Sequence, residues 1–365
     1  MNVSHFLIAL CVFCLTVAAS LLFVSRAIKV AHRFGILDPR ETGHADHSSV
    51  PRFGGGAVFL AFALGLASTF VLDVERRSIE TERLLLLLAG AALVTGVMIY
   101  DDVLGIAPIP KLLMQIGAAA IVVLPRLHGV DHGIVIDQFN TPFFGVVHLP
   151  LILVLPASIF WIVGMMNTMN FVDGLDGLAS SVTLVACAVL FAHTYFWPRE
   201  APQFTISLLA ATLGASVLGF LWFNWHPAKI ILGDAGANFL GFALAVVAII
   251  GGAKIATALL ALGLPILDVA WVILYRLMHG RSPLKGGDRG HLHHRLLDSG
   301  WTQPQVVTFV ASVSAVFGLG ALLLPDQLTK LVALGVLGIV LLATISMLAM
   351  RDRQRRAPSR KDLTA

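Results

Sequence analysis

The sequence is poor in charge and in cysteine. Of its 365 residues, 13% are charged and 57% are hydrophobic, and the mean hydropathy is +0.86. A water-soluble protein could not cover so much apolar surface with so few charged side chains. The three cysteines, Cys11, Cys14 and Cys187, all lie in apolar stretches, which argues against a disulfide framework and against a cysteine-based metal site.

The apolar residues fall in blocks of about twenty, the length that an α-helix needs to cross the ~30 Å hydrocarbon layer of a bilayer. These blocks predict an all-α polytopic membrane protein with about eleven transmembrane helices. Residues 1–350 are expected to form a single membrane domain, followed by a basic tail over 351–365. The expected spans are residues 4–27, 56–73, 84–100, 111–127, 151–168, 177–197, 204–223, 237–252, 256–276, 305–323 and 331–350.

Basic residues are distributed unevenly between the two sides of these spans. If the N-terminus lies outside, 18 lysines and arginines fall on the inner side and 7 on the outer side. The positive-inside rule therefore predicts an external N-terminus and a cytoplasmic C-terminus. The same excess accounts for the sequence pI of about 9.1, so the basic character is a topology signal and predicts no nucleic-acid partner.

The segments richest in Asp, Asn, His and Gly all fall on the predicted cytoplasmic side. A cation-coupled transporter would more often place its carboxylates in the middle of the bilayer. Five polar segments on one face instead suit an enzyme that joins a cytosolic substrate to a membrane-bound one. These segments are residues 32–56, 100–111, 167–176, 224–238 and 280–295.

Two adjacent carboxylates, Asp101 and Asp102, lie at the inner end of the third expected span. Neighbouring carboxylates repel one another, so they are stable mainly when they are solvated or when a cation lies between them. The pair is therefore either a solvated helix end or part of a cation site. Lys111, at the start of the next span, is either a lysine that extends to the membrane interface or a positive charge that binds phosphate.

The segment from Asn167 to Asp176 is the richest in polar side chains. Two amides and two carboxylates, Asn167, Asn170, Asp173 and Asp176, recur every three residues. This spacing predicts that they lie near one helical face. A polar stripe at the end of a membrane helix is costly without partners, so we interpret it as a binding surface.

Asp234 lies between glycines just before the eighth expected span. This position is typical of an ordinary helix N-cap, for which Asp is a preferred residue. It is equally consistent with a metal ligand that is held in a tight turn. The residue types alone do not decide between the two roles.

Three histidines, His291, His293 and His294, occur within four residues, with Arg289 and Arg295 beside them. No nearby cysteine or carboxylate supplies the usual spacing of a zinc site. The flanking arginines favour an anionic ligand such as a phosphate or a phosphorylated sugar. A solvated loop and a transition-metal site are the alternatives.

Taken together, these residues combine carboxylates, amides and basic groups on one membrane face. Hard oxygen ligands suit Mg²⁺, which takes one or two carboxylates and completes its shell with waters and substrate phosphates. Basic side chains and histidines would hold a polyphosphate. The residues therefore predict Mg²⁺-assisted phosphoryl chemistry on a lipid substrate, without identifying the group that is transferred.

Five motifs follow one another through the chain: PRFGGG, DDVLG with IPKLLMQ, NTMNFVDGLDGLA, WHPAKIILGDAGANFLG, and PILDVAWVILYR with DRGHLHHRL. In this order they resemble the polyprenyl-phosphate N-acetylhexosamine-1-phosphate transferase family, which includes the enzyme that makes lipid-linked muramyl-pentapeptide. The HLHH form is more similar to the N-acetylglucosamine branch. One feature departs from the family pattern: Asp46 stands where relatives place a basic pair or Ser-Ser before a histidine, with His44 and His47 nearby.

The resemblance implies a catalytic domain on the cytoplasmic face of a bacterial inner membrane. It would transfer N-acetylhexosamine 1-phosphate from a UDP-sugar, expected to be UDP-N-acetylglucosamine, to undecaprenyl phosphate, and UMP would leave. The product would begin a cell-envelope polysaccharide such as lipopolysaccharide O-antigen or teichoic acid. Mg²⁺ is the implied cofactor, with Mn²⁺ as a substitute, and membrane lipid and a second copy of the chain are candidate partners.

The resemblance also assigns roles to individual residues. Asp101 and Asp102 are implied to be catalytic: Asp101 orients the lipid phosphate or removes its proton, and Asp102 holds the magnesium region. Asn170 and Asp234 are the implied metal ligands. The implied substrate-binding residues are Lys111, Asn167, Asp173, Asp176, His291, His293, His294 and Arg295.

Three other activities are alternatives to this one. A phospho-N-acetylmuramoyl-pentapeptide transferase belongs to the same family and would use a larger donor. A CDP-alcohol phosphotransferase is also a membrane Mg²⁺ enzyme, but its spaced Asp-Gly and Ala-Arg signature is absent from this sequence. A cation-coupled transporter would use the same carboxylates, but at mid-bilayer depth.

Overall fold

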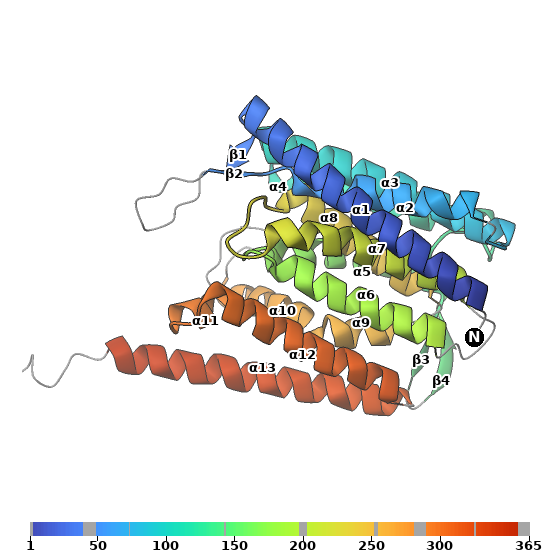
Figure 1. The fold of residues 1–365 in the computed structure, drawn as a ribbon. Helices are drawn as coiled ribbons and strands as arrows, with labels where there is room; N and C mark the ends of the chain where they lie inside the picture. Colours follow the sequence, from blue (N-terminus) through green and yellow to red (C-terminus); the bar gives the residue numbers. More distant parts are fainter. Residues whose placement is uncertain are drawn as a thin grey trace, which may run out of the picture.

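The computed structural model of the chain shows long helices that run side by side, with short connections at their two ends (Figure 1). It describes residues 3–38, 49–72, 74–141, 144–196, 203–251, 255–280, 290–324 and 326–356. The elements are α1 (Val3–Phe34), β1 (Leu37–Asp38), β2 (Val50–Pro51), α2 (Gly54–Val71), α3 (Ser78–Leu104), α4 (Pro108–Val123), the 3₁₀ helix η1 (Leu124–His128), β3 (Gln138–Thr141), β4 (Gly145–His148), α5 (Leu151–Val172), α6 (Leu178–Phe196), α7 (Phe204–Asn224), α8 (Gly233–Ile250), α9 (Ile255–Ala261), α10 (Gly263–Met278), α11 (Leu292–Asp298), α12 (Gln303–Leu323) and α13 (Gln327–Arg356).

The predicted all-α polytopic membrane class is confirmed. Ten helices of the described chain are long and apolar enough to cross a membrane. Two shorter helices, α9 and α10, pass the same test as a pair but meet at a bend of 80°, so the ninth expected span is broken. With that pair counted as one span, the total reaches the expected eleven. The last helix runs on to Arg356, so the first part of the expected tail is helical.

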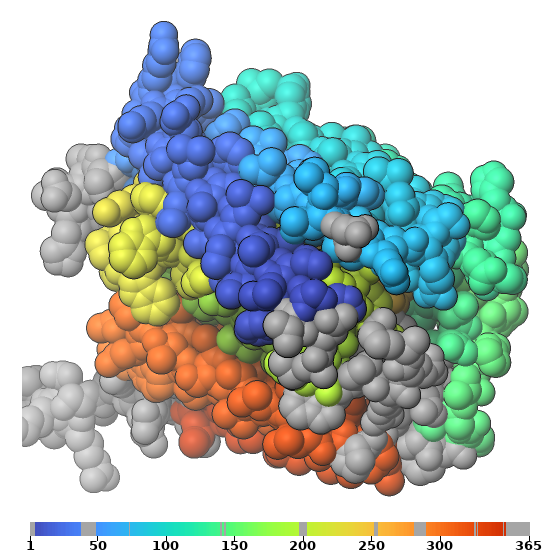
Figure 2. Space-filling model, turned by 45° about the vertical axis from the view of Figure 1, so that its right-hand side comes forward, coloured from blue at the N-terminus to red at the C-terminus, as the bar shows by residue number. Residues whose placement is uncertain are grey.

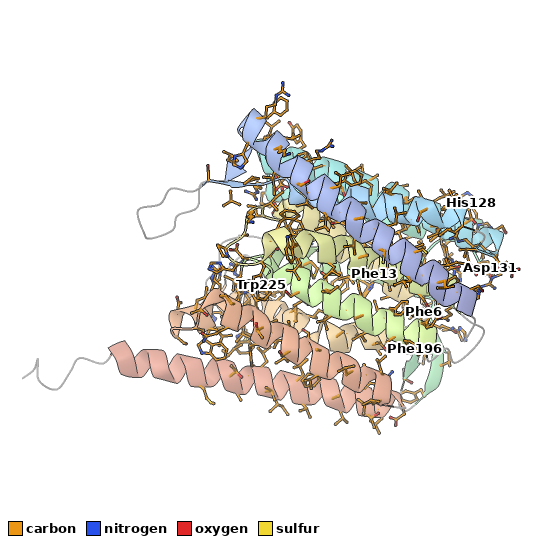
Figure 3. All side chains as sticks on the ribbon, in the orientation of Figure 1. Phe6, Phe13, His128, Asp131, Phe196 and Trp225 are labelled. Carbon is orange, nitrogen blue, oxygen red and sulfur yellow. The ribbon has the colours of Figure 1, made fainter. Side chains whose placement is uncertain are left out.

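The two small sheets lie at opposite ends of the helices (Figure 1). Strands β1 and β2 pair antiparallel at one end, and the hairpin of β3 and β4 lies at the other. His128 and Asp131 lie toward the hairpin end, whereas Trp225 lies at the opposite end (Figure 3). These two ends are the expected membrane faces.

Outward-facing side chains along the helices are largely apolar, as a bilayer requires. Helix α1 forms a ridge across the face shown in Figure 2, and its Leu7, Leu10 and Leu22 are exposed. Phe160 of α5 and Val316 of α12 are exposed in the same way. Lipid covers such residues in a membrane protein at no cost, because acyl chains are as apolar as the side chains.

Helix α8 is the centre of the bundle. It is buried along almost its whole length and packs against α2, α3 and α5. Small residues allow this close approach. A Cβ atom added at Gly55 would come within 2.1 Å of the Gly236 nitrogen, and one added at Gly241 within 2.4 Å of the Met165 carbonyl oxygen. The first turn of α8 is therefore surrounded by three other helices.

Candidate active site

Backbone pairing brings the segment before α2 to the start of α8. The Ile231 N–H donates to the Pro51 carbonyl at 3.0 Å, and the Gly55 N–H donates to the Leu232 carbonyl at 2.9 Å. Arg52 forms an isolated parallel bridge with Ile231. These bonds place the Arg52 side chain beside the N-terminus of α8.

Asp102, on helix α3, caps the N-terminus of α8. It lies in the last turn of α3, and its side chain is only 3% exposed. Its Oδ1 accepts the Asp234 N–H at 2.9 Å, and its Oδ2 accepts the Ala235 N–H at 3.0 Å. The Arg52 Nε donates to the same Oδ1 at 3.0 Å. A carboxylate suits this place because free N–H groups and the helix dipole both favour negative charge there.

This arrangement settles the structural role of Asp234. Helix α8 begins at Gly233, four residues before the predicted span, so Asp234 lies inside the helix. The residue in the N-cap position is Leu232, which makes no side-chain capping bond. Gly233 has φ +74°, and a Cβ atom there would lie 2.8 Å from Asp102 Oδ2. The N-cap interpretation of Asp234 is therefore wrong, because Asp102 supplies the cap. The Asp234 side chain is left for other contacts.

Asp234 is the point where basic and amide groups converge. Lys111, in the first turn of α4, contacts its Oδ2. The Asn170 Nδ2 donates to its Oδ1 at 2.9 Å, and the Arg52 guanidinium lies 3.7 Å from the same oxygen. Three helices and the segment before α2 thus meet at one carboxylate that keeps about a quarter of its side-chain surface exposed.

Asp101 is joined to this cluster through the same lysine. The Lys111 Nζ lies 2.8 Å from Asp101 Oδ2, while Asp101 Oδ1 accepts the Ile106 N–H at 2.6 Å. Each of the two adjacent carboxylates thus has its own basic partner, Lys111 for Asp101 and Arg52 for Asp102. The pair is therefore not a solvated helix end: both side chains are buried, and each contacts a side-chain cation.

Asn167 lies one turn deeper in α5 and belongs to a network of amides. Its Nδ2 donates to Gln115 Oε1 at 2.9 Å and to the Val163 carbonyl at 2.8 Å. The Gln115 Nε2 donates in turn to Asn238 Oδ1 at 2.6 Å, and the Asn238 Nδ2 donates to the Asp234 carbonyl at 2.9 Å. These bonds link α4, α5 and α8 just below the charged cluster.

The four polar residues of the Asn167 segment do not share one helical face. Helix α5 ends at Val172, and the following turns place Asp176 elsewhere. The buried Asp176 Oδ2 lies 2.9 Å from His226 Nδ1 and accepts the Ala228 N–H at 3.1 Å. Asp176 thus fixes the loop between α7 and α8, and its predicted role in substrate binding remains untested.

Asp173 faces the cluster from the end of α5. Removal of its carboxyl group from solvent raises its pKa well above the usual range, and the negative charges of Asp234 and Asp102 raise it further. These charge effects show that Asp173 belongs to the same electrostatic environment as the carboxylates on α3 and α8.

His293 and His294 lie on α11, and His291 directly precedes this helix. The buried His291 ring stacks on Phe171, with ring centroids 5.4 Å apart, and His293 follows at 5.6 Å from His291. A Cβ atom at Gly174 would meet His293 Nε2 at 2.5 Å. The histidine segment therefore contacts the same stretch of chain that carries Asn170 and Asp173.

His293 has an orphaned polar atom. Its Nε2 is buried and has no hydrogen-bond partner in the described chain. Burial, together with the neighbouring His294 and His291, lowers the pKa of His293 to about 3, so the ring is neutral near pH 7. The Arg295 Nε donates to the Gly290 carbonyl at 2.9 Å. His44, Asp46, His47 and Arg289 lie outside the described residues.

The structure unites most of the predicted site residues. Asp101, Asp102, Lys111, Asn170 and Asp234 are in direct contact, and the α11 histidines adjoin them through α5. Sequence reasoning gave no role to several residues that hold this arrangement, although five of them occur in the quoted motifs. These residues are Arg52, Gln115, Asn224, His226, Asn238 and Asp268.

The cluster fits a magnesium ion that is shared with substrate. In the described chain, no three His, Cys, Asp or Glu side chains group closely enough to hold a metal alone. Mg²⁺ needs only one or two carboxylates when phosphates and waters complete its shell. The Asn170 Nδ2 lies 2.9 Å from Asp234 Oδ1. These two neighbouring side chains carry a carboxylate and an amide carbonyl, so their oxygen ligands suit this ion.

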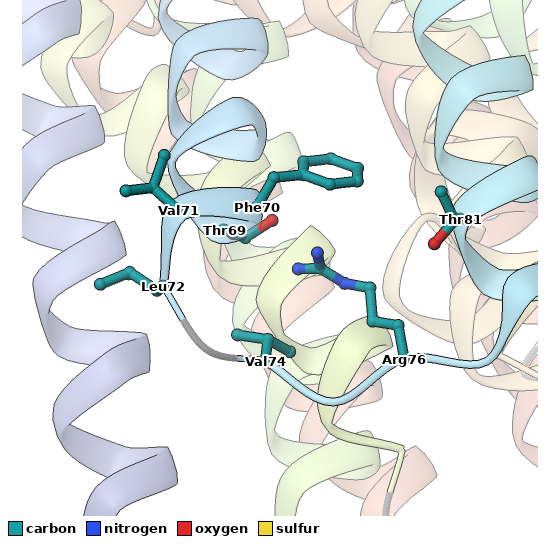
Figure 4. Close-up of a pocket in the computed structure, with 7 residues that line it drawn as sticks. All are labelled: Thr69, Phe70, Val71, Leu72, Val74, Arg76 and Thr81. Atoms are coloured by element: carbon teal, nitrogen blue, oxygen red, sulfur yellow. The ribbon is translucent and has the colours of Figure 1, made fainter.

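A separate cavity of about 340 Å³ lies at the far end of α2 and α3. The Arg76 guanidinium extends into it and lies 4.7 Å from the centre of the Phe70 ring (Figure 4). Thr81 and Asp101 are twenty residues apart on α3, which corresponds to about 30 Å of helix. This cavity is therefore not part of the charged cluster. It is lined by Thr69, Phe70, Val71, Leu72, Val74, Arg76 and Thr81.

Known proteins are similar to this chain over most of its length. Residues 84–252, which include Asp101, Lys111, Asn170 and Asp234, match the family model described as Glycosyl transferase family 4. The decaprenyl-phosphate N-acetylglucosaminephosphotransferase of Mycobacterium leprae is 30% identical over 341 residues, which are 83% of this chain and 81% of the relative.

Two further relatives differ in coverage. A Bacillus subtilis protein, named "Probable undecaprenyl-phosphate N-acetylglucosaminyl 1-phosphate transferase", is 29% identical over 302 residues, 81% of this chain and 79% of its own. The phospho-N-acetylmuramoyl-pentapeptide-transferase of Borrelia duttonii is 32% identical over 194 residues, 50% of this chain and 55% of its own. With its membrane-spanning bundle and its matched charged cluster, the chain belongs to glycosyl transferase family 4 and is a phosphoglycosyl transferase.

Proposed function

We propose that the protein transfers N-acetylglucosamine 1-phosphate from UDP-N-acetylglucosamine to a polyprenyl phosphate, expected to be undecaprenyl phosphate. The observation that carries the proposal is the convergence of Asp101, Lys111, Asn170 and Asp234 at one end of the bundle. Both substrates are polyanions, and a mixed cluster of acidic, basic and amide groups can bind them when a divalent cation is shared. The long relatives named for N-acetylglucosamine transfer support this choice.

The proposed reaction is a displacement at phosphorus. An oxygen of the lipid phosphate forms a bond to the phosphorus next to the sugar, and the bond from that phosphorus to the bridging oxygen breaks. The electron pair leaves with UMP. A phosphate monoester with a second pKa near 6 is already mostly dianionic at pH 7, so Asp101 has to accept a proton only from the remaining monoanion.

Each group in the cluster has a definite place in this scheme. Lys111 would move from its carboxylate partners to the diphosphate, where it neutralises the charge that develops on the leaving UMP. Asp234 and Asn170 would hold Mg²⁺, which when bound supplies charge neutralisation at the phosphates. Asp102 keeps the start of α8 and Arg52 in place through three hydrogen bonds.

The histidine helix supports a sugar-phosphate site. His293 Nε2 is buried without a partner in the described residues, and a ligand hydroxyl or amide would satisfy it. His291 stacks on Phe171 of α5, and the neighbouring Asn170 donates to Asp234. We place the N-acetylhexosamine near α11 and the metal-bound diphosphate near Asp234.

Donor selectivity tests the proposal. Purified protein in detergent, with undecaprenyl phosphate and Mg²⁺, is expected to release UMP from UDP-N-acetylglucosamine at least ~100-fold more efficiently than from UDP-muramyl-pentapeptide. A site that hydrogen-bonds specific sugar groups discriminates strongly, because a mismatched donor leaves buried polar groups unpaired. Turnover with the muramyl-pentapeptide donor and none with a simple hexosamine would reverse the branch, and no UMP from any donor would refute the function.

We further propose that the site faces the cytoplasm of a bacterial inner membrane and that the N-terminus lies outside. The three native cysteines are replaced by serine, and single cysteines are introduced at exposed positions. An impermeant maleimide should label Val130→Cys and Phe144→Cys in intact cells, but Ile109→Cys and Trp225→Cys only after the membrane is opened. Labelling of Ile109→Cys in intact cells would reverse the orientation.

A further inference from the structure

Asp268 is a buried carboxylate on α10 that the proposed mechanism does not use. Its side chain is 8% exposed, similar to that of its partner His291 at 7%. Its Oδ2 lies 2.9 Å from His291 Nδ1, and its Oδ1 accepts the Leu292 N–H at 2.9 Å. One carboxylate therefore holds both the histidine ring and the first turn of α11.

This contact determines which ring nitrogen of His291 carries a proton. An ionised carboxylate only accepts hydrogen bonds, so Nδ1 must be the donor in a 2.9 Å contact. The other nitrogen, Nε2, lies on the opposite edge of the ring and is available for a ligand. Histidines in metal and catalytic sites are often oriented in this way by a carboxylate.

The surroundings of His291 fix the plane of its ring as well. One face stacks on Phe171, whose neighbour Asn170 contacts Asp234. On the same helix, His293 packs against Gly174 at the end of α5. Rotation of the His291 ring would therefore lose both the stacking contact and the Asp268 hydrogen bond. The ring has one well-defined orientation next to the charged cluster.

We propose that Asp268 is a positioning residue for the transfer reaction: it holds the His291 proton on Nδ1 and so presents Nε2 to the diphosphate–sugar donor. This inference rests on the proposed function, because it assigns a use to His291 in that site. It predicts that the effect of Asp268 on turnover passes entirely through His291. Asp268 itself touches no substrate.

The substitution Asp268→Asn separates positioning from helix capping. The asparagine carbonyl can still accept the Leu292 N–H, since Asn and Asp cap helices about equally well. Its NH₂ group, however, donates to Nδ1 and moves the ring proton to Nε2. We expect kcat/KM for the donor to fall about 10- to 100-fold, while the thermal unfolding midpoint in detergent stays unchanged. Asp298→Asn, the same change at the exposed end of α11, is the matched control.

A double variant tests whether the effect passes through His291. If it does, Asp268→Asn adds no further loss in a His291→Ala background, because the two changes remove the same interaction. If the two losses multiply, or if Asp268→Asn alone stays within about twofold of wild type, the proposal is wrong. His291→Gln replaces the alanine variant if the latter is not recovered from the membrane.

The tautomer is also measurable without turnover. In ¹⁵N-histidine-labelled protein, the His291 Nδ1 resonance should have the chemical shift of a protonated nitrogen, and in Asp268→Asn the proton should appear on Nε2. A deprotonated Nδ1 in the wild type would overturn the inference. If the wild type released no UMP from any donor, the proposed function would fail, and this spectrum would still decide the role of Asp268.

Discussion

Asp234→Asn is expected to reduce turnover by about 10³-fold while the protein still folds and inserts. Asparagine keeps the size of the side chain and its place in the first turn of α8, but it removes the negative charge. That charge attracts Lys111 and Arg52 and would bind the divalent cation. The helix itself loses nothing, because Asp102 caps it. Release of UMP from UDP-N-acetylglucosamine measures the loss.

The control for this prediction is Asp137→Asn. Asp137 is half-exposed near the hairpin end and lies 3.8 Å from Arg126, so the same chemical change there should leave turnover unaffected. The unfolding midpoint in detergent shows whether each variant is folded. A fully active Asp234→Asn enzyme would show that Asp234 is neither a metal ligand nor a charge needed for catalysis.

Asp102→Ala is expected to lower the free energy of unfolding by about 3 kcal/mol. Its side chain is 3% exposed, and its removal leaves the N–H groups of Asp234 and Ala235 without their acceptor. It also breaks the 3.0 Å pair with Arg52. Buried donors that lose their partner cost far more than the original bond contributed. Chemical denaturation in detergent gives the difference from wild type.

Two comparisons make the Asp102 prediction specific. Asp102→Asn retains one acceptor oxygen and should destabilise the protein less than alanine does. Asp137→Ala breaks a partly exposed ion pair and should cost less than about 1 kcal/mol. If Asp102→Ala were as stable as Asp137→Ala, the tertiary cap on α8 would contribute nothing to the fold.

Much of the fold was predictable because the bilayer imposes a simple rule. Each helix must satisfy its backbone hydrogen bonds internally, so every crossing appears as a long apolar block. The break between α9 and α10 was not predicted, since an average hydropathy over Ile255–Met278 does not register a change of direction. The bend of 80° depends on how these two helices pack against their neighbours.

The site was predictable in its chemistry but not in its contacts. Asp101, Lys111 and Asp234 were noted as charged residues at the ends of apolar spans, and the resemblance to the family supplied their roles. Arg52 and Asp268 were quoted within motifs without a role. Arg52 reaches the site because its backbone pairs with Ile231. Asp268 reaches it through a contact with His291, which lies 23 positions later in the sequence. Neither leaves a periodic pattern in the sequence.

The regular spacing of the Asn167 segment was misleading for a physical reason. Three-residue spacing puts side chains on one face only while the helix continues. Helix α5 ends at Val172, and Gly177 adopts a positive φ of +77° in the turns that follow. Asp173 therefore faces the charged cluster, whereas Asp176 turns toward His226. The sequence shows residue types but not the end of the helix that orients them.

The tertiary cap on α8 also constrains the order in which the protein assembles. Asp102 is synthesised 132 positions before the Asp234 N–H that it accepts, which corresponds to roughly ten seconds of translation at 5–20 residues per second. Arg52 precedes Asp102 by only 50 positions, so the two can pair as soon as α3 is inserted. This early pair would keep a carboxylate and a guanidinium neutralised in the membrane until α8 arrives and completes the cap.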